Sequence, residues 1–529
     1  GLGDVYKRQF PVRGKSETAD GEVHVMSEAH QREVAEQHTA KVIGVSIAAA
    51  VGGFLFGFDS SVVNGAVDSI EDTFGLNSFF TGFAVAIALL GCALGAWFAG
   101  RLADVWGRKR VMLLGSALFV ISAIGTCFTV TVWDLLLWRV LGGIGIGIAS
   151  VIAPAYISEI APARYRGALA SMQQLAITLG IFAALLSDAL LADAAGTASS
   201  ELWFGLEAWR WMFLVGVIPA VVYGLLALTI PESPRYLVGR NRDEEAARIL
   251  QEVTGEAHPL ERVKEIKLTV KRESSASVRD IRGHSFGLHP LVWIGIWLAI
   301  FQQFVGINAI FYYSTTLWQS VGFSESASFQ TSVITAVINV AMTFVAILFV
   351  DRIGRKKLLL AGSVGMFVGL LMACVAFTQA TYKQSGSVGD VMCTAGNTTK
   401  ECLTLADPWG VIALIGANLF VVFFAATWGP VMWVMLGEMF PNRLRGVALG
   451  VCTAANWIAN FTISMLFPPV SENLGLGVVY GFFAFCAAAS FVFVLRKVEE
   501  TKGMELEEMD GVADRLSAVL PGAGGRKAG

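Results

Sequence analysis

The stretch DVWGRK at residues 104–109 is repeated as DRIGRK at residues 351–356. A longer pair of motifs accompanies it, because YISEIAPARYRGAL at 156–169 is echoed by VMLGEMFPNRLRGVAL at 434–449. In both longer motifs a Glu precedes an Arg by seven residues. Internal similarity of this kind indicates that the chain is built from two related halves, each with one copy of both motifs.

Long apolar blocks surround these motifs. The 529-residue chain is 55% hydrophobic and 15% charged, with a mean hydropathy of +0.61, which is too little charge to cover a soluble surface. Each block is long enough to cross the ~30 Å hydrocarbon core of a membrane as a helix, and none has the short alternating pattern of a β-barrel strand. Twelve blocks are predicted, at about 42–67, 78–100, 111–131, 133–157, 167–192, 209–230, 289–317, 327–350, 358–380, 409–437, 444–468 and 474–495.

The blocks and the repeat together predict an all-α membrane protein with twelve transmembrane helices in two pseudo-symmetric six-helix halves. The short motifs follow the second and eighth blocks, and the longer motifs follow the fourth and tenth. Halves related by an axis along the membrane normal are a transporter architecture, in which the substrate lies between the halves near the midplane.

Lys and Arg predict the orientation. They gather in the two short motifs and in segment 231–288, which holds eleven of them, whereas the opposite loops offer only Lys383 and Lys400. Positive charge favours the cytoplasmic side, so both termini are expected there. The predicted divisions are a tail at 1–41, a first half at 42–230, a linker with short helices at 231–288, a second half at 289–497 and a tail at 498–529. Met26 is the expected natural start, and residues 1–25 are set aside.

Composition excludes several classes of function. A net charge of −3 implies no nucleic-acid partner, and seven cysteines are too few for a disulfide framework. Whether Cys393 and Cys402 form a disulfide in their loop stays open. Neither a nucleophile–base pair nor a metal-ligand cluster stands out, so we expect no enzyme and no cofactor.

Several motifs resemble known families. The DxxGRK loops resemble the cytoplasmic loop signature of the major facilitator superfamily. Four further stretches resemble its sugar porter family, and the likeness runs from about 42 to 508; one departure is Val498-Glu499, where that family usually has a proline before the Glu-Thr. The stretches are PESPRYL (231–237), QQFVGINAIFYY (302–313), WGPVMWVMLGEMFPNRLRG (428–446) and ETKGMELEE (500–508).

Asp59 is a candidate for proton coupling. It lies inside the first block, in FLFGFDSSVVNGA (54–66). A carboxylate at the bilayer centre costs at least ~2.5 kcal/mol, so it needs water, a partner or a proton. Arg139, inside the fourth block, is its natural partner, and protonation of the acid would break the pair. A static ion pair is the alternative, but the resemblance favours coupling, since proton-coupled sugar porters carry Asp here.

Neutral amides are candidates for binding a neutral polyol, because an amide both donates and accepts hydrogen bonds. Gln302, Gln303 and Asn308 lie on different faces of an ideal helix. The seventh span is therefore expected to be surrounded by protein or locally unwound near Gly306. The alternative is that these amides only bond to neighbouring helices.

The resemblance extends both sets of residues. Its sugar contacts correspond to Gln174, Gln302, Gln303, Asn308, Asn339, Trp433 and Asn456, with Phe56 and Gly429 as weaker correspondences; Trp433 would stack on the sugar ring. A cytoplasmic charge set is implied to latch the two halves when the protein faces outward; it comprises Asp104, Arg108, Glu159, Arg166, Asp351, Arg355, Glu438 and Arg445.

The predicted function is inward symport of a monosaccharide with a proton, by alternating access across the plasma membrane. An uncoupled uniporter, a membrane sugar sensor and an exporter of drugs or organic cations remain as alternatives. We expect a monomer in contact with membrane lipid, and the sequence leaves the identity of the sugar open.

Overall fold

The structure of the chain is a computed structural model that describes residues 28–160, 166–273, 288–383, 402–405, 408–440 and 442–501. Several points raised by the sequence fall outside the described residues: the start of the chain at 1–25, the open question of a disulfide between Cys393 and Cys402, because Cys393 is not described, and the tail after 501. The side chains of Arg166, Asp351 and Arg445 also lie outside the described part.

The first half and the linker are helical, with one two-stranded hairpin. The first half consists of α2 (Glu28–Val62), η1 (Val63–Ala66), α3 (Val67–Phe74), α4 (Ser78–Trp106), α5 (Arg108–Cys127), α6 (Val132–Ile160), α7 (Arg166–Ala195), β1 (Glu201–Trp203), β2 (Leu206–Glu207), α8 (Ala208–Val215) and α9 (Val217–Thr229). The linker consists of α10 (Pro234–Gly239), α11 (Asp243–Ile249), η2 (Leu250–Thr254) and α12 (Pro259–Glu273).

The second half has a similar order of elements. It consists of α13 (Pro290–Phe304), α14 (Ile307–Ser320), α15 (Glu325–Ile353), α16 (Arg355–Thr378), β3 (Thr381–Lys383), β4 (Cys402–Thr404), α17 (Trp409–Phe423), η4 (Phe424–Trp428), α18 (Gly429–Met439), α19 (Asn442–Leu474) and α20 (Leu476–Lys497). Both hairpins, β1–β2 and β3–β4, are antiparallel.

Within the described residues, twelve helices or broken helices are long and apolar enough to cross a membrane. Each overlaps one of the predicted blocks, so the predicted fold class is confirmed. Some helices end later than predicted, where the sequence becomes charged. For example, α4 continues to Trp106, beyond the predicted end at 100. Hydropathy marks the apolar part of a span and misses the polar turn that continues the same helix outside it.

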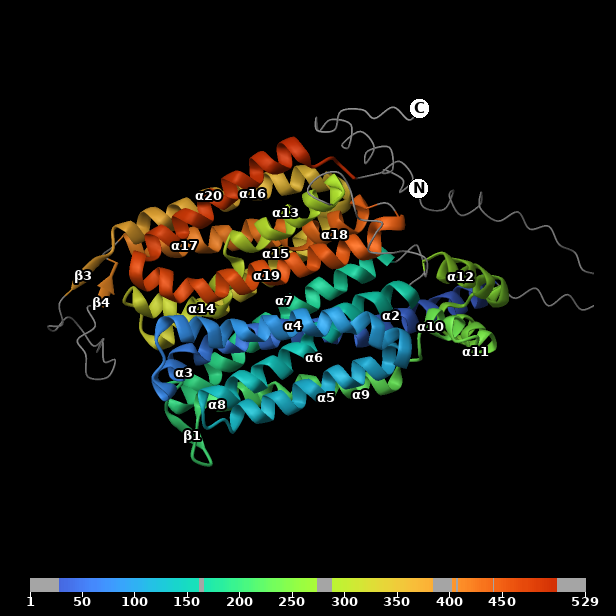
Figure 1. The fold of residues 1–529 in the computed structure, drawn as a ribbon, viewed down its shortest axis with the longest axis horizontal. Coiled ribbons are helices and arrows are strands. Elements are labelled where there is room, and N and C mark those ends of the chain that lie inside the picture. The colour runs from blue at the N-terminus through green and yellow to red at the C-terminus, as the bar shows by residue number, and fades with distance from the viewer. Residues whose placement is uncertain are drawn as a thin grey trace, which may run out of the picture.

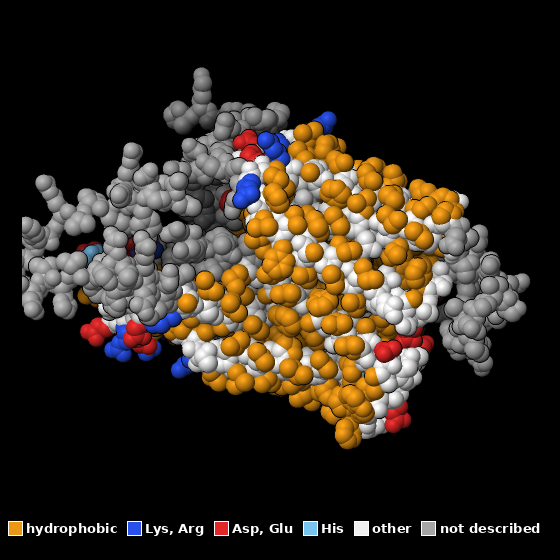
Figure 2. Space-filling view, turned by 180° about the vertical axis from the view of Figure 1, so that it is seen from behind, with side chains coloured by type: hydrophobic (Ala, Val, Ile, Leu, Met, Phe, Trp, Pro, Cys, Tyr) orange, Lys and Arg blue, Asp and Glu red, His pale blue; other side chains and the backbone are white. Residues whose placement is uncertain are grey.

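The two halves lie side by side along the long axis of the molecule (Figure 1). Helices α2–α9 form one half and α13–α20 the other, and they meet where α4 packs on α19 and α7 packs on α15. The linker helices α10–α12 lie at one end, which we call the linker end. The opposite end, which we call the far end, carries α3, β1 and the β3–β4 hairpin. Figure 2 shows that apolar side chains cover the outer surface between these ends, as a lipid-facing surface requires.

The seventh span is broken between α13 and α14. Gly306 adopts a left-handed backbone with φ of 87°, and a Cβ there would lie 2.3 Å from the Phe483 ring. Only glycine fits such a position without strain. Most of the apolar stretch of this span (72%) is buried inside the protein. The span is therefore both locally unwound at Gly306 and surrounded by protein, as its scattered amides predicted.

Glycines of the fourth span allow close helix packing. A Cβ on Gly143 would lie 2.1 Å from the Ala88 carbonyl oxygen, and a Cβ on Gly147 would lie 2.1 Å from the Cys92 carbonyl oxygen. Small residues thus let the backbones of α4 and α6 touch. This packing holds α6, which carries Arg139, against the second span.

Candidate functional site

Asp59 and Arg139 form an ion pair inside the first half. An Asp59 carboxylate oxygen (Oδ1) accepts a hydrogen bond from Arg139 Nη1 at 3.1 Å, and the two residues are 6% and 4% exposed. The guanidinium carbon of Arg139 lies 5.5 Å from the centre of the Phe213 ring, and its Nε has no hydrogen-bond partner among the described residues. One hydrogen bond thus holds two buried charges, and removing either charge would leave the other uncompensated.

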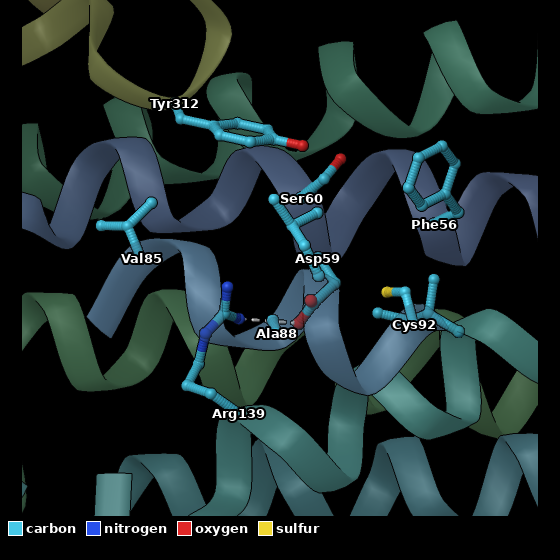
Figure 3. Close-up of a pocket in the computed structure, with 10 residues that line it drawn as sticks. Phe56, Asp59, Ser60, Val85, Ala88, Cys92, Arg139 and Tyr312 are labelled. Carbon is cyan, nitrogen blue, oxygen red and sulfur yellow. Dashed lines mark hydrogen bonds and ion pairs between the residues drawn. The ribbon is translucent and has the colours of Figure 1, made fainter. Parts of the chain in front are cut away.

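A small pocket opens beside this pair. Its lining comes from the first half except for Tyr312, which α14 contributes from the second half. In Figure 3 the Tyr312 ring lies on one side of the Asp59–Ser60 segment and Arg139 lies on the other. The ion pair is therefore in a position to respond to movement between the halves. The lining residues are Phe56, Asp59, Ser60, Val85, Ala88, Leu89, Cys92, Arg139, Ile146 and Tyr312.

Four predicted amides form one hydrogen-bonded cluster, which we call the amide cluster: Gln302, Gln303, Asn308 and Asn456. Gln303 is its centre, because its Nε2 donates to the Asn456 side-chain oxygen at 3.1 Å and its Oε1 accepts from Asn308 Nδ2 at 2.5 Å. Gln302 accepts from Asn456 Nδ2 at 2.9 Å. The cluster is anchored to the backbone of span ten, since Gln302 Nε2 donates to the carbonyl oxygens of Trp428 and Gly429.

Two helices connect the amide cluster to the ion-pair pocket. On α14, Asn308 precedes Tyr312 by one turn, and on α19, Asn456 precedes Asn460 by one turn. Asn460 Nδ2 donates to the Tyr312 hydroxyl at 3.4 Å. Residues four apart share a helix face, so each helix carries one contact to the cluster and one to the pocket. Sequence reasoning missed Asn460, although its four-residue spacing from Asn456 was a readable signal.

The remaining predicted sugar contacts are Gln174, Asn339, Trp433 and Phe56. Among the described residues, no hydrogen bond joins Gln174, Asn339 or Trp433 to the amide cluster. Asn339 is 5% exposed and Gln174 is half-buried, whereas Trp433 on α18 is 36% exposed and so keeps part of its indole free. Phe56 lines the ion-pair pocket, and its ring packs edge-on against Trp457 of the second half, with ring centres 5.4 Å apart.

The predicted charge set pairs within each half in this conformation. Arg108 donates to both oxygens of Glu159 at 3.1 and 2.9 Å, and also contacts Asp104 at 3.2 Å. Arg355 donates in the same way to both oxygens of Glu438, at 3.0 and 2.8 Å. Two parallel bonds of this type fix the carboxylate geometrically. The repeated motifs thus build the same bidentate pair twice at the linker end.

A third part of the repeat went unnoticed in the sequence. A Glu232 oxygen accepts from the Arg108 backbone N–H at 2.9 Å, and a Glu500 oxygen accepts from the Arg355 backbone N–H at 2.8 Å. The next residue completes each site: Ser233 donates to Glu159 at 2.5 Å, as Thr501 donates to Glu438 at 2.6 Å. The Glu-Ser of PESPRYL and the Glu-Thr of ETKGMELEE are therefore structural equivalents, too short to be recognised as a repeat.

Hydrogen bonds between the halves gather at the far end. Asn64 Nδ2 donates to the Phe311 carbonyl oxygen at 3.0 Å and to Ser314 Oγ at 2.7 Å, and Asn64 Oδ1 accepts from the Thr315 N–H at 3.0 Å. One turn on, Asp68 accepts from Thr316 Oγ1 at 2.9 Å and Gln319 Nε2 at 3.2 Å. These contacts, which sequence reasoning missed, hold the far end closed.

Among the described residues, no group of three or more His, Cys, Asp and Glu side chains is arranged to hold a metal ion. The polar groups at the centre of the molecule are a carboxylic acid, a guanidinium, a phenol and several amides.

Comparison with known proteins places these features in a family. Residues 45–513 match the family model described as sugar (and other) transporter. A glucose transport protein of Synechocystis sp. is 50% identical over 88% of this chain and 97% of that protein. The D-xylose-proton symporter of Escherichia coli K12 is 34% identical over 90% of this chain and 96% of that protein.

Solved structures agree with the sequence comparison. An inward-open conformation of the xylose transporter XylE from E. coli matches with a TM-score of 0.72 and 32% identity, over 89% of this chain and 99% of that chain. The major facilitator superfamily proton:xylose symporter XylE, bound to 6-bromo-6-deoxy-D-glucose, matches with a TM-score of 0.73 and 32% identity, over 90% of this chain and 99% of that chain.

Proposed function

Since this chain belongs to the family of sugar (and other) transporters, we propose that it carries a monosaccharide into the cell together with a proton, by alternating access. It is a multi-pass membrane transporter, not an enzyme. The names of related transporters supply the candidate substrates, which are glucose, xylose and arabinose.

The observation that supports proton coupling is the buried ion pair of Asp59 and Arg139, which is joined by one hydrogen bond and lines the same pocket as Tyr312. A proton on the carboxylate removes its charge and weakens its hold on the guanidinium, which cannot itself lose a proton. Because α2 and α6 are joined through this pair, its state biases how the two helices pack. Tyr312 carries that bias to the second half, where the sugar binds.

The amide cluster is the proposed sugar site. Its members already bond to one another, so a sugar hydroxyl would replace an existing hydrogen bond and little net energy would be gained per bond. The site would then select among sugars by rejecting those that lack a hydroxyl at a needed position. Such a sugar leaves a buried amide without a hydrogen-bond partner, which costs binding free energy. The half-exposed Trp433 would cover the apolar face of the ring. Gln174, Asn339, Phe56 and Gly429 would complete the site as the halves close.

The far-end contacts of Asn64 and Asp68 describe one state of the cycle, with that end shut. We place the linker end and both termini in the cytoplasm, because Lys and Arg concentrate there. The protein would act in the plasma membrane as a monomer surrounded by lipid. In the opposite state the far end would open, and the residues of the linker end, Arg166 and Arg445 among them, would latch across the halves.

The test is sugar-evoked current in proteoliposomes of the purified full chain. Glucose, galactose, xylose, arabinose and myo-inositol would be added to wild type and to Asp59→Asn. The expected result is an inward-positive current with one or two sugars in wild type and none in the variant. Electrically silent equilibration of labelled sugar by wild type would contradict the coupling and identify an uncoupled uniporter. Silence in both assays would contradict sugar transport itself.

A further inference from the structure

Asp188 on α7 is a second buried acid, and no ion pair joins it to a described residue. It is 0% exposed, and neither carboxylate oxygen makes a hydrogen bond of full geometry with a described residue. The backbone N–H of Gly65 in η1 is a polar neighbour of this carboxyl. The contact is close, because a Cβ on Gly65 would lie 2.9 Å from Asp188 Oδ2 and 2.9 Å from the Met212 sulfur.

Charged groups on the surrounding elements are engaged elsewhere. Asp59 and Arg139 pair with each other, and Arg210 donates to Glu207 and to the carbonyl oxygens of Cys127 and Thr129. None of these three side chains forms a hydrogen bond or ion pair with Asp188. The described titratable and charged side chains on the elements that pack against α7 are His38, Lys41 and Asp59 on α2, Asp134, Arg139, Tyr156 and Glu159 on α6, Arg210 on α8, Glu201 on β1, and Glu325 and Arg352 on α15.

The two buried acids thus differ in kind. Asp59 has a guanidinium at 3.1 Å that offsets its charge, whereas Asp188 has an apolar enclosure and one backbone amide. An isolated carboxylate is strongly disfavoured in such a place, and the group stays neutral by keeping a proton. A neutral carboxyl can also remain packed against Gly65 without water.

Asp188 contacts the segment that makes the hydrogen bonds of the closed far end. Its partner Gly65 directly follows Asn64, whose side chain makes three hydrogen bonds to the second half. Ser61 lies on the same face of the first span, four residues before Gly65, and its Oγ is buried without a partner among the described residues. Loss of the proton from Asp188 would draw water to this contact and displace η1, and with it the Asn64 bonds.

We propose that Asp188 is a second proton-binding site of the transport cycle, occupied when the far end is closed and emptied when it opens. The geometry that carries this is a partnerless, fully enclosed carboxyl wedged against the backbone that positions Asn64. A proton bound in the closed state favours closure, so rising pH on the far side favours opening. The role in transport rests on the proposed function, but occupancy by a proton does not.

The direct test is infrared spectroscopy of the purified full chain near neutral pH, which separates the C=O band of a protonated carboxyl from that of a carboxylate. We expect the wild-type spectrum minus that of Asp188→Asn to contain a protonated-carboxyl band. The matched control is Asp193→Asn, which removes an exposed acid five residues along the same helix and should remove no such band. A difference spectrum for Asp188→Asn without the band overturns the proposal.

A second variant covers the case in which Asp188→Asn fails to fold. Gly65→Ala keeps the acid and presses on it, so it should shift the frequency of the same band. An unchanged band in Gly65→Ala, where the Cβ meets the carboxyl, would show that the band belongs to another acid and would overturn the assignment.

The role in transport is tested by sugar exchange in the Asp59→Asn background, which removes the first proton site. The rate of exchange should still fall as pH rises, because the closed far end needs the proton on Asp188. The fall should be at most about tenfold per pH unit, which is the limit for one proton. Adding Asp188→Asn should flatten that dependence, and adding Asp193→Asn should not. A flat profile before Asp188 is changed would contradict this role. Failure of the proposed function has a different signature, because wild type would then equilibrate labelled sugar without any current.

Discussion

Asn64 is the residue whose removal should most clearly open the far end. Its side-chain amide bridges the Phe311 carbonyl and the Thr315 N–H, two groups of α14 at the spacing of a helical hydrogen bond, and it also donates to Ser314. The Asn64→Ala change removes these three hydrogen bonds of Asn64 to the second half. Ser314 keeps a second partner in Ser332, so the loss is confined to the contact between the halves.

The size of the effect follows from these bonds. A neutral hydrogen bond contributes about 0.5–1.5 kcal/mol net, so three contribute about 1.5–4.5 kcal/mol. At about 1.4 kcal/mol per factor of ten, the equilibrium between closed and open far ends should shift roughly ten- to a thousandfold toward open. Sugar would then reach its site more often from the far side and leave less often at the linker end.

The assay is a distance distribution between spin labels at Phe79 on α4 and Val411 on α17, which are exposed near the far end of each half. Asn64→Ala should transfer population from the short to the long distance. The matched control is Asn77→Ala, because the Asn77 side chain caps α4 within one half by accepting from the Phe80 N–H, and this change should leave the distances alone. Identical distributions in wild type and Asn64→Ala would refute the claim that these bonds hold the far end shut.

Three further changes have defined expectations. Gln303→Ala removes the centre of the amide cluster and leaves its neighbours without partners, so sugar affinity measured by calorimetry should fall about tenfold or more, at 1–3 kcal/mol per buried group left unsatisfied; unchanged affinity would place the sugar elsewhere. Gly306→Ala forces a side chain into a left-handed backbone at a cost of about 1–2 kcal/mol before any clash, so the midpoint of thermal unfolding should drop. The control Gly437→Ala, whose Cβ would have nothing within 4 Å, should not lower the midpoint. Arg355→Lys keeps the charge but loses one of two parallel bonds to its carboxylate on α18, worth about 1.5–3 kcal/mol, and an unaltered unfolding midpoint would contradict a stabilising role for this pair.

Hydropathy and the repeat were enough to predict the spans and the halves, because a membrane helix must bury about twenty apolar residues wherever it occurs. Chemical logic also identified Asp59 with Arg139, and Gln302 with Gln303 and Asn308, since charged and amide groups inside a span need partners. The structure brings each of these sets together.

Contacts between the halves could not be predicted in the same way. Asn64 and Asp68 are ordinary polar residues in the sequence, and their importance arises only because α14 of the other half passes beside them. Asp188 was absorbed into an apolar block, since one acid barely lowers the mean hydropathy of a span. The Glu-Ser and Glu-Thr pairs at 232–233 and 500–501 are too short to show as a repeat, yet they have the same partners in both halves.

The most direct test of the central claim compares exchange with accumulation in Asp59→Asn proteoliposomes. If a proton on Asp59 couples sugar movement to the gradient, the variant should still exchange labelled sugar across the membrane but should not concentrate it when the outside is acidified. Wild type should do both. Accumulation by the variant equal to that of wild type would contradict the account and leave the Asp59–Arg139 pair with a structural role alone.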